Sequence, residues 1–222
     1  FVNRPVSKEQ RHPFLAAGDQ QRIQLQLLAQ FGGLALQIGF ILPASGHVAH
    51  LAYGKVTMGH YLSGDRPAGV TPELERAASL FEGAGIPVEK CDDLILARWR
   101  KLFWNIAFNG PCALLGATTD LVVSSPATRQ LTRDLMAEVR AGALSMGRDI
   151  PESFIDDILD STDRMAPYKP SMMLDAENRR PLEAEAIYGE PLRTAAEHGV
   201  DLPAVRTIYR QLVFLDERLR SA

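Results

Sequence analysis

The sequence has few cysteines and no long apolar run among its 222 residues. Its two cysteines, Cys91 and Cys112, lie far apart and outside any Cys-x-x-Cys pair, which indicates neither a zinc site nor a disulfide framework. The most apolar stretch, residues 34–44, is shorter than the ~20 residues that a membrane helix needs. These absences favour a soluble protein of the reducing cytoplasm with no membrane partner.

Neither sign of charge is in excess, because 24 basic side chains face 27 acidic ones and the formal net charge is −3. This balance excludes a strongly basic nucleic-acid-binding protein, so no nucleic-acid partner is expected. The length corresponds to about one and a half domains of ~150 residues each. The first residue is Phe1 rather than Met, and we expect the chain to have been trimmed or to continue upstream.

Signals of β-strands are confined to the first part of the sequence. Residues 1–18 show no periodicity and predict an irregular arm, whereas residues 19–30 have a helical pattern. An apolar run then predicts a strand within residues 34–42. Two further short runs, 47–53 and 56–58, predict a hairpin around the Gly-Lys pair that separates them.

The clearest helix start in this part lies at Thr71 and Pro72, which suit the N-cap and the first helical position. Apolar residues follow at helical spacing, namely Leu74, Ala77, Leu80 and Phe81. Gly83 and Gly85 are expected to end this helix.

From about residue 90 the sequence indicates helices alone, expected over residues 92–109, 126–146, 151–165, 183–198 and 202–220. The fold class is therefore mainly α, with a helical domain over 91–222 and a partial α/β portion over 1–90. The last helix carries an apolar seam that faces either a core or a partner, and its members are Val205, Ile208, Leu212, Leu215 and Leu219.

A row of polar residues interrupts the apolar helix expected over 92–109. Lys101, Asn105 and Asn109 stand at i, i+4 and i+8, and at about 100° per residue they lie within about 80° of one another. Buried polar groups need partners, and the sequence leaves two interpretations open. Either Lys101 reaches solvent while the asparagines cap neighbouring loops, or the three side chains bind a ligand.

A second polar cluster lies in residues 170–175, where a loop carrying Ser171 is expected to lead toward the next long helix. Glu183 follows near the N-terminus of that helix, where the helix dipole favours any carboxylate. Glu183 is therefore either an ordinary first-turn acid or the partner of a buried ammonium or a cofactor hydroxyl.

No metal site is expected from the remaining residues. His47 and His50 are three residues apart on an expected strand, so their side chains point to opposite faces. The acidic residues of helix 151–165 are more typical of a solvated helix face than of a metal site, and they are Asp156, Asp157, Asp160 and Asp163.

Four separated blocks of residues share an order and a spacing. They are Trp99-x-Lys101-x3-Asn105-x3-Asn109, Ser171-Met172-x2-Asp175, Arg180-x2-Glu183-x5-Gly189 and Gly199-Val200-x2-Pro203. In these blocks the chain resembles the C-terminal domain of the ketopantoate reductase (2-dehydropantoate 2-reductase) family, and the resemblance extends over about residues 38–218. Residues 43–59 and 85–88 resemble the last part of the coenzyme domain of that family.

The resemblance implies a helical substrate domain of the 6-phosphogluconate-dehydrogenase-like type beside a Rossmann-type coenzyme domain. It implies NADPH as cofactor and ketopantoate, or a similar small-molecule 2-oxo acid, as the substrate that is reduced to a 2-hydroxy acid in pantothenate biosynthesis. Lys101 would be the general acid, since an ammonium both stabilises oxyanion charge and supplies a proton. Asn105, Asn109 and Ser171 would bind the substrate, and Glu183 would contact the coenzyme or orient Lys101.

The Gly-x-Gly-x-x-Gly turn of Rossmann domains is missing, and Gly83-Ala-Gly85 is expected to end a helix instead. Residues 1–90 are therefore expected to form an incomplete dinucleotide-binding portion. Residues 118–123 and 167–175 are expected to set which 2-oxo acid fits. A rival interpretation is a non-catalytic helical module that forms a homodimer through its 202–220 seam.

Overall fold

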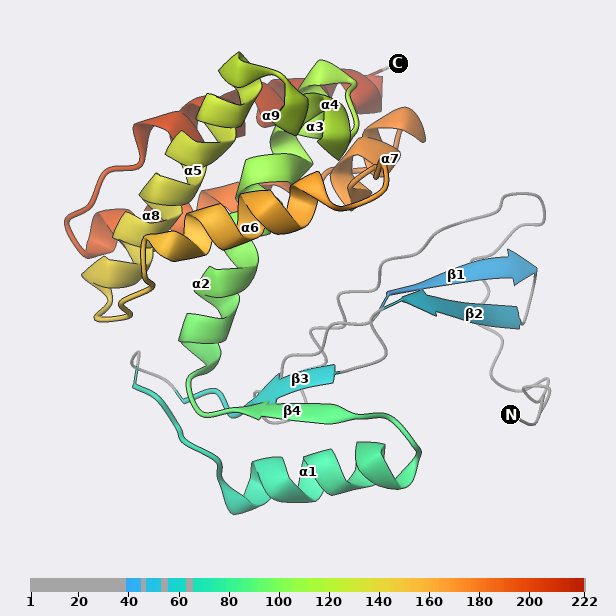
Figure 1. The fold of residues 1–222 in the computed structure, drawn as a ribbon, viewed down its shortest axis with the longest axis vertical. Helices are drawn as coiled ribbons and strands as arrows, with labels where there is room; N and C mark the ends of the chain where they lie inside the picture. The colour runs from blue at the N-terminus through green and yellow to red at the C-terminus, as the bar shows by residue number, and fades with distance from the viewer. Residues whose placement is uncertain (1–38, 45–46, 53–55, 63–65, 222) are drawn as a thin grey trace. The chain divides into compact units, whose positions relative to one another are not determined.

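The computed structural model describes residues 39–44, 47–52, 56–62 and 66–221. The chain folds as two compact units, and the boundary between them lies between Leu94 and Ile95 (Figure 1). The arm predicted over 1–18, the helix predicted over 19–30 and the first part of the strand predicted over 34–42 lie outside the described residues. In the part of the chain that is described, no helix is long and apolar enough to span a membrane.

The first unit contains two strand pairs of opposite kinds. Strands β1 (Gly39–Ala44) and β2 (His47–Ala52) are antiparallel, with Phe40 opposite His50 in the register. Strands β3 (Val56–Gly59) and β4 (Val88–Cys91) are parallel. The hairpin predicted between β2 and β3 is therefore wrong. Because helix α1 separates β3 from β4 in the chain, β3 pairs across a β-α-β connection and β2 pairs with β1.

Helix α1 (Pro72–Gly83) begins as the sequence predicts. The Thr71 hydroxyl accepts a hydrogen bond from the Leu74 amide at 3.3 Å, and Pro72 follows the cap. Leu74 and Ala78 of α1 form a small core with Val56 and Met58 of β3. One predicted apolar position is wrong, because Leu80 is 76% exposed, and Ala78 is buried on the face that packs.

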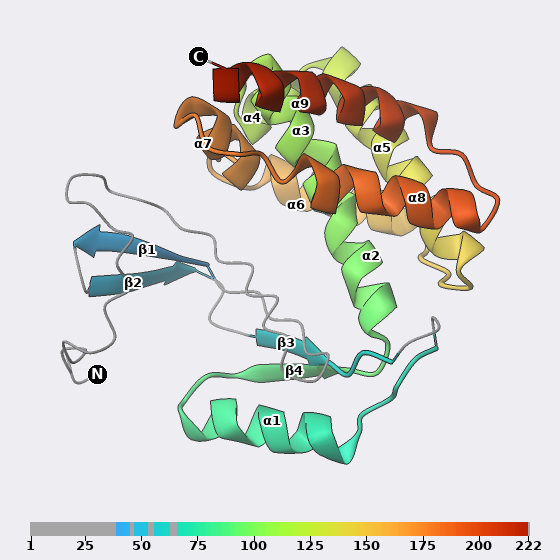
Figure 2. The same cartoon turned by 180° about the vertical axis from the view of Figure 1, so that it is seen from behind.

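The second unit is helical (Figures 1 and 2). Its elements are α2 (Leu94–Trp104), the π-helix η2 (Asn105–Asn109), α3 (Gly110–Leu115), α4 (Thr119–Ser124), α5 (Pro126–Ser145), α6 (Ser153–Asp163), α7 (Ser171–Glu177), the π-helix η3 (Glu185–Gly189), α8 (Glu190–Glu197) and α9 (Pro203–Ser221). The mainly α fold class is confirmed. The sequence missed α3, α4 and α7, because helices of six or seven residues are too short to show a clear period.

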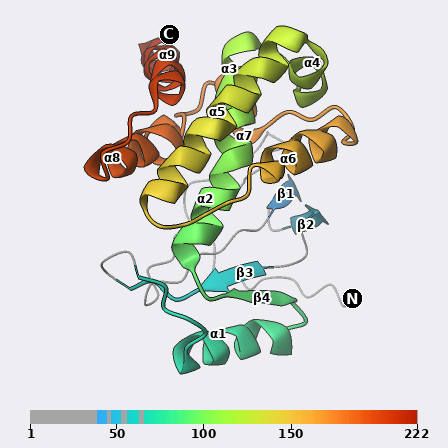
Figure 3. The ribbon, with the colours of Figure 1, turned by 60° about the vertical axis from the view of Figure 1, so that its left-hand side comes forward.

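Helix α5 packs on η2, α8 and α9, and all four contribute buried residues to the core (α5, α8 and α9 are labelled in Figure 3). The seam of α9 faces this core rather than a partner, because Val205, Ile208 and Leu212 are buried and Leu215 and Leu219 pack against the core. The seam is therefore covered within one chain.

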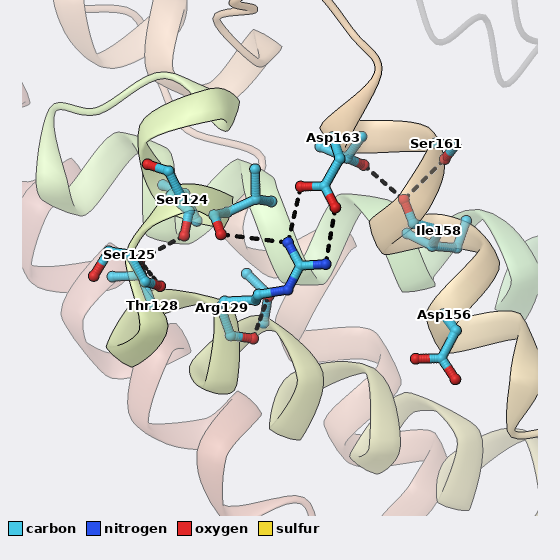
Figure 4. A network of polar contacts seen from close by, with 12 residues as sticks. Ser124, Ser125, Thr128, Arg129, Asp156, Ile158, Ser161 and Asp163 are labelled. Carbon is cyan, nitrogen blue, oxygen red and sulfur yellow. Dashed lines mark hydrogen bonds and ion pairs between the residues drawn. The ribbon is translucent and has the colours of Figure 1, made fainter.

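Helices α5 and α6 are joined by ion pairs on the acidic face of α6. Arg129 donates to both carboxylate oxygens of Asp163 at 2.8 Å (Figure 4), and this bond lowers the pKa of the Asp163 carboxyl. Arg129 also reaches the Val123 carbonyl of α4 at 3.4 Å, and Arg133 pairs with Asp156 at 2.5 Å. Exposed pairs contribute at most about 1 kcal/mol each, so their main effect is to fix α4 and α6 against α5.

Glu138 of α5 is expected to stabilise the start of α9. Its carboxylate accepts hydrogen bonds from the Ala204 and Val205 amides at 2.8 and 2.9 Å, which satisfies two N–H groups that a helix leaves free. Glu138→Ala should lower the free energy of unfolding by about 1–2 kcal/mol, the range of a lost N-cap. Urea unfolding followed by circular dichroism measures this. The exposed Glu197→Ala is the control and should change stability by less than about 0.5 kcal/mol.

Candidate active site

Lys101 lies in the last turn of α2 and is half-buried. Burial lowers the pKa of its ammonium, while the carboxylate of Glu183 acts in the opposite direction. The structure therefore brings Lys101 into electrostatic contact with an acid that lies far away in the sequence.

The row that begins at Lys101 does not continue on a straight α-helix. Residues Asn105–Asn109 form the π-helix η2, whose hydrogen bonds span five residues instead of four. Its wider turn replaces the α geometry from which the 80° stripe was predicted. Asn105 and Asn109 thus occupy the two ends of a single widened turn.

Asn109 has an unusual environment for a polar side chain. It is 2% exposed, and its Oδ1 atom has no hydrogen-bond partner among the described residues. Leaving such a buried acceptor unpaired costs about 1–3 kcal/mol. The Oδ1 atom of Asn109 does not cap a neighbouring loop, as the first interpretation from the sequence required. The second interpretation, in which the side chain binds a ligand, remains.

Two more buried oxygens, both at the start of α4, have no hydrogen-bond partner in the part of the chain that the structure describes. They are Oγ1 of Thr119 and Oδ1 of Asp120. The sequence had pointed to residues 118–123 only as a loop that sets substrate size. A Thr-Thr-Asp sequence is typical of a helix start, so no local signal distinguishes these two oxygens from ordinary capping groups.

Ser171 is the first residue of α7, which packs against η2 and α3. The sequence predicted a loop over 170–175, and this is wrong, because Pro170 precedes a helix at Ser171 instead of extending a loop. Asp175, in the same helix, accepts hydrogen bonds from Arg180 at 2.7 and 2.8 Å. Helix α7 therefore brings Ser171 into an element that packs on η2, and it brings the Asp175 carboxylate within electrostatic reach of Glu183.

Glu183 lies two residues before η3, near a helix N-terminus as predicted. Its side chain keeps an exposed surface, yet the surrounding atoms raise the pKa of its carboxyl, Asp175 raises it further and Lys101 lowers it. The turn that carries Glu183 is held in place by the Leu182 amide, which donates to Asp216 of α9 at 2.8 Å. The surrounding protein thus disfavours the charged forms of Lys101 and Glu183, and the attraction between the two groups acts in the opposite direction.

Comparison with known proteins points to one family. The family described as "Ketopantoate reductase PanE/ApbA C terminal" matches residues 93–215. A 2-dehydropantoate 2-reductase of Nostoc sp. is 48% identical over 177 residues, which are 80% of this chain and 56% of that protein. The solved 2-dehydropantoate 2-reductases of Methylococcus capsulatus and Geobacter metallireducens have TM-scores of 0.74 and 0.72 at 34% and 39% identity.

The chain belongs to the ketopantoate reductase family. The resemblance carried by the four sequence blocks is thereby confirmed. The alignments with the two solved ketopantoate reductases cover 83% and 81% of this chain but 57% and 59% of theirs. The chain therefore spans little more than half the length of the ketopantoate reductases that it matches.

The described residues of the first unit do not fit the pyrophosphate of a dinucleotide coenzyme. A Rossmann domain receives this group at the N-terminus of a helix that follows a glycine-rich turn. The N-terminus of α1 carries Glu73 and Glu75 in its first turn, and its cap is the Thr71 side chain. Two carboxylates repel a phosphate at this end. Among the described residues, no group of three or more potential metal ligands gathers either.

Replacing Lys101 by Met is expected to raise the free energy of unfolding by about 1 kcal/mol at neutral pH, because it removes a charge that burial disfavours. The folded pKa of Lys101 lies below its ordinary 10.5, so the unfolded chain holds more protons between the two values and the wild type gains stability as the pH rises there. The advantage of Lys101→Met should therefore shrink toward pH 10.5.

Urea unfolding at a series of pH values measures this difference. The exposed neighbour Arg100 provides the control, since Arg100→Met removes a charge that is already in water. An advantage of Lys101→Met that stays constant or grows with pH would contradict a lowered pKa.

Proposed function

We propose that this chain supplies the substrate-binding and proton-donating residues for the NADPH-dependent reduction of ketopantoate, or a similar 2-oxo acid, to the 2-hydroxy acid. The observation that carries the proposal is that the half-buried Lys101 is electrostatically coupled to Glu183. Farther along the same segment, the buried Oδ1 atom of Asn109 has no hydrogen-bond partner among the described residues. Membership of the ketopantoate reductase family supports it.

Lys101 is the proton donor in this proposal. Reduction of a ketone places negative charge on its oxygen, which a neighbouring ammonium stabilises and then protonates. Burial shifts the pKa of Lys101 down from 10.5, which makes the ammonium a stronger acid near neutral pH. Glu183 keeps the amine charged until the proton is needed and orients it.

Asn105, Asn109 and Ser171 bind the oxygens of the 2-oxo acid. An amide and a hydroxyl fix an anionic substrate by hydrogen bonds without adding charge. Asn109 supports this role most directly, because the hydroxyl of ketopantoate can donate to its buried Oδ1 atom, whereas carboxylate and ketone oxygens only accept and pair with its amide N–H groups.

NADPH supplies the hydride when it is bound. The described residues do not fit its pyrophosphate, so this proposal assigns no phosphate contact to the first unit. The predicted contact of Glu183 with the coenzyme, the cytoplasmic location and the homodimer stay predictions from the sequence.

Lys101→Ala is expected to lower kcat for ketopantoate reduction by about 10²–10⁴, the usual contribution of a general acid. Activity is followed by the loss of NADPH absorbance, in this chain and in a chimera that adds the part of the Nostoc relative outside the alignment. Arg100→Ala is the matched control on the same helix and should keep full activity. Full activity of Lys101→Ala, with an intact circular dichroism spectrum, would remove the general-acid assignment.

A further inference from the structure

The side chain of Tyr188 joins the two π-helices of the helical unit. It has no exposed surface, and its hydroxyl lies against the backbone of η2. The hydroxyl donates to the Ile106 carbonyl at 2.8 Å, with the Asn105 carbonyl at 3.4 Å, and accepts from the Gly110 amide at 2.7 Å. A single group from η3 thus contacts both ends of the turn that carries Asn105 and Asn109.

These contacts correspond to what a π-turn requires. A turn that changes from i+4 to i+5 hydrogen bonds leaves backbone groups of the α-pattern without their usual partners. Buried backbone groups without partners are costly, and a hydroxyl can satisfy a carbonyl and an N–H at the same time. Burial raises the pKa of the Tyr188 hydroxyl, so it stays protonated and able to donate.

The backbone at Gly110 is shaped to receive this hydroxyl. A Cβ atom at Gly110 would collide with the Tyr188 ring and hydroxyl and would lie 2.8 Å from the Ile208 side chain. Glycine is therefore the residue that lets the hydroxyl approach the amide.

We propose that the Tyr188 hydroxyl is a positioning group that keeps η2 in its π-form and thereby sets the direction of the Asn105 and Asn109 side chains. The role of those asparagines in holding a 2-oxo acid rests on the proposed function. The effect of Tyr188 on their orientation does not, because it concerns the chain without ligand.

Selective ¹⁵N labelling of asparagine tests the proposal in the 222-residue chain. Tyr188→Phe removes only the hydroxyl and should shift the side-chain amide signals of Asn105 and Asn109, with exposed Asn178 as the internal reference. Exchange of the Gly110 amide should become at least about tenfold faster. Tyr209→Phe is the matched control, because its hydroxyl bonds to the exposed Glu185 carboxylate at 2.5 Å.

Calorimetry with ketopantoate as the probe provides the second measurement. Tyr188→Phe should weaken its binding at least about tenfold, and Tyr209→Phe should leave it unchanged. Asparagine signals that are unchanged in Tyr188→Phe would overturn the positioning role, whatever ketopantoate does. Shifted signals in a chain whose wild type binds no ketopantoate would refute the proposed function and keep the positioning role.

If Tyr188→Phe does not fold, the wild-type chain decides. A slowly exchanging Tyr188 hydroxyl proton with a cross-peak to the Gly110 amide would support the proposal. A hydroxyl proton that exchanges rapidly with water would overturn it.

Discussion

The burial of Asn109 in an apolar segment, with Lys101 and Asn105 half-buried before it, is the constraint on which the helical unit depends. Phe103, Ile106 and Phe108 on the same segment have no exposed surface, so polar groups beside them have little access to water. The fold satisfies the main chain here, through the Tyr188 hydroxyl, but leaves the Oδ1 atom of Asn109 without a partner among the described residues. A fold that satisfies the backbone and not the side chain keeps that side chain available to a ligand.

The same region stores electrostatic free energy in Lys101 and Glu183. The surrounding protein lowers the pKa of Lys101 and raises the pKa of Glu183. The opposite charge of each group shifts the pKa of the other back toward its ordinary value. A pair balanced in this way exchanges a proton more readily than a pair held in water, where both groups keep their ordinary pKa. Asp175, itself bound to Arg180, adds negative charge beside Glu183 and shifts the balance further. The arrangement lowers the stability of the folded chain at neutral pH, because the surrounding protein disfavours the charged form of Lys101.

The features of the fold that could be predicted from the sequence are those whose signal lies within a single segment of the chain. Helix α5 was predicted to within a residue of its observed end, because twenty residues repeat one period and a proline marks the start. The Thr71 cap of α1 was equally readable. The predicted hairpin was wrong because strand pairing depends on which segment lies beside β3. The packing of α1 decides this. Helix α7 was not predicted because seven residues after a proline resemble a loop in the sequence.

In the candidate site, too, some features have a signal in the sequence and others depend on contacts between distant segments. Lys101, Ser171 and Glu183 are predicted site residues because their spacing matches a family pattern, whereas the electrostatic coupling of Lys101 to Glu183 is visible only in the fold. The π-form of η2 has no signature in the sequence, since its cause is a tyrosine hydroxyl from a segment far along the chain. Local periodicity therefore places the asparagines on a helix, whereas a tertiary contact decides their direction. A substitution at Tyr188 is therefore expected to change the direction of the Asn105 and Asn109 side chains without changing either residue.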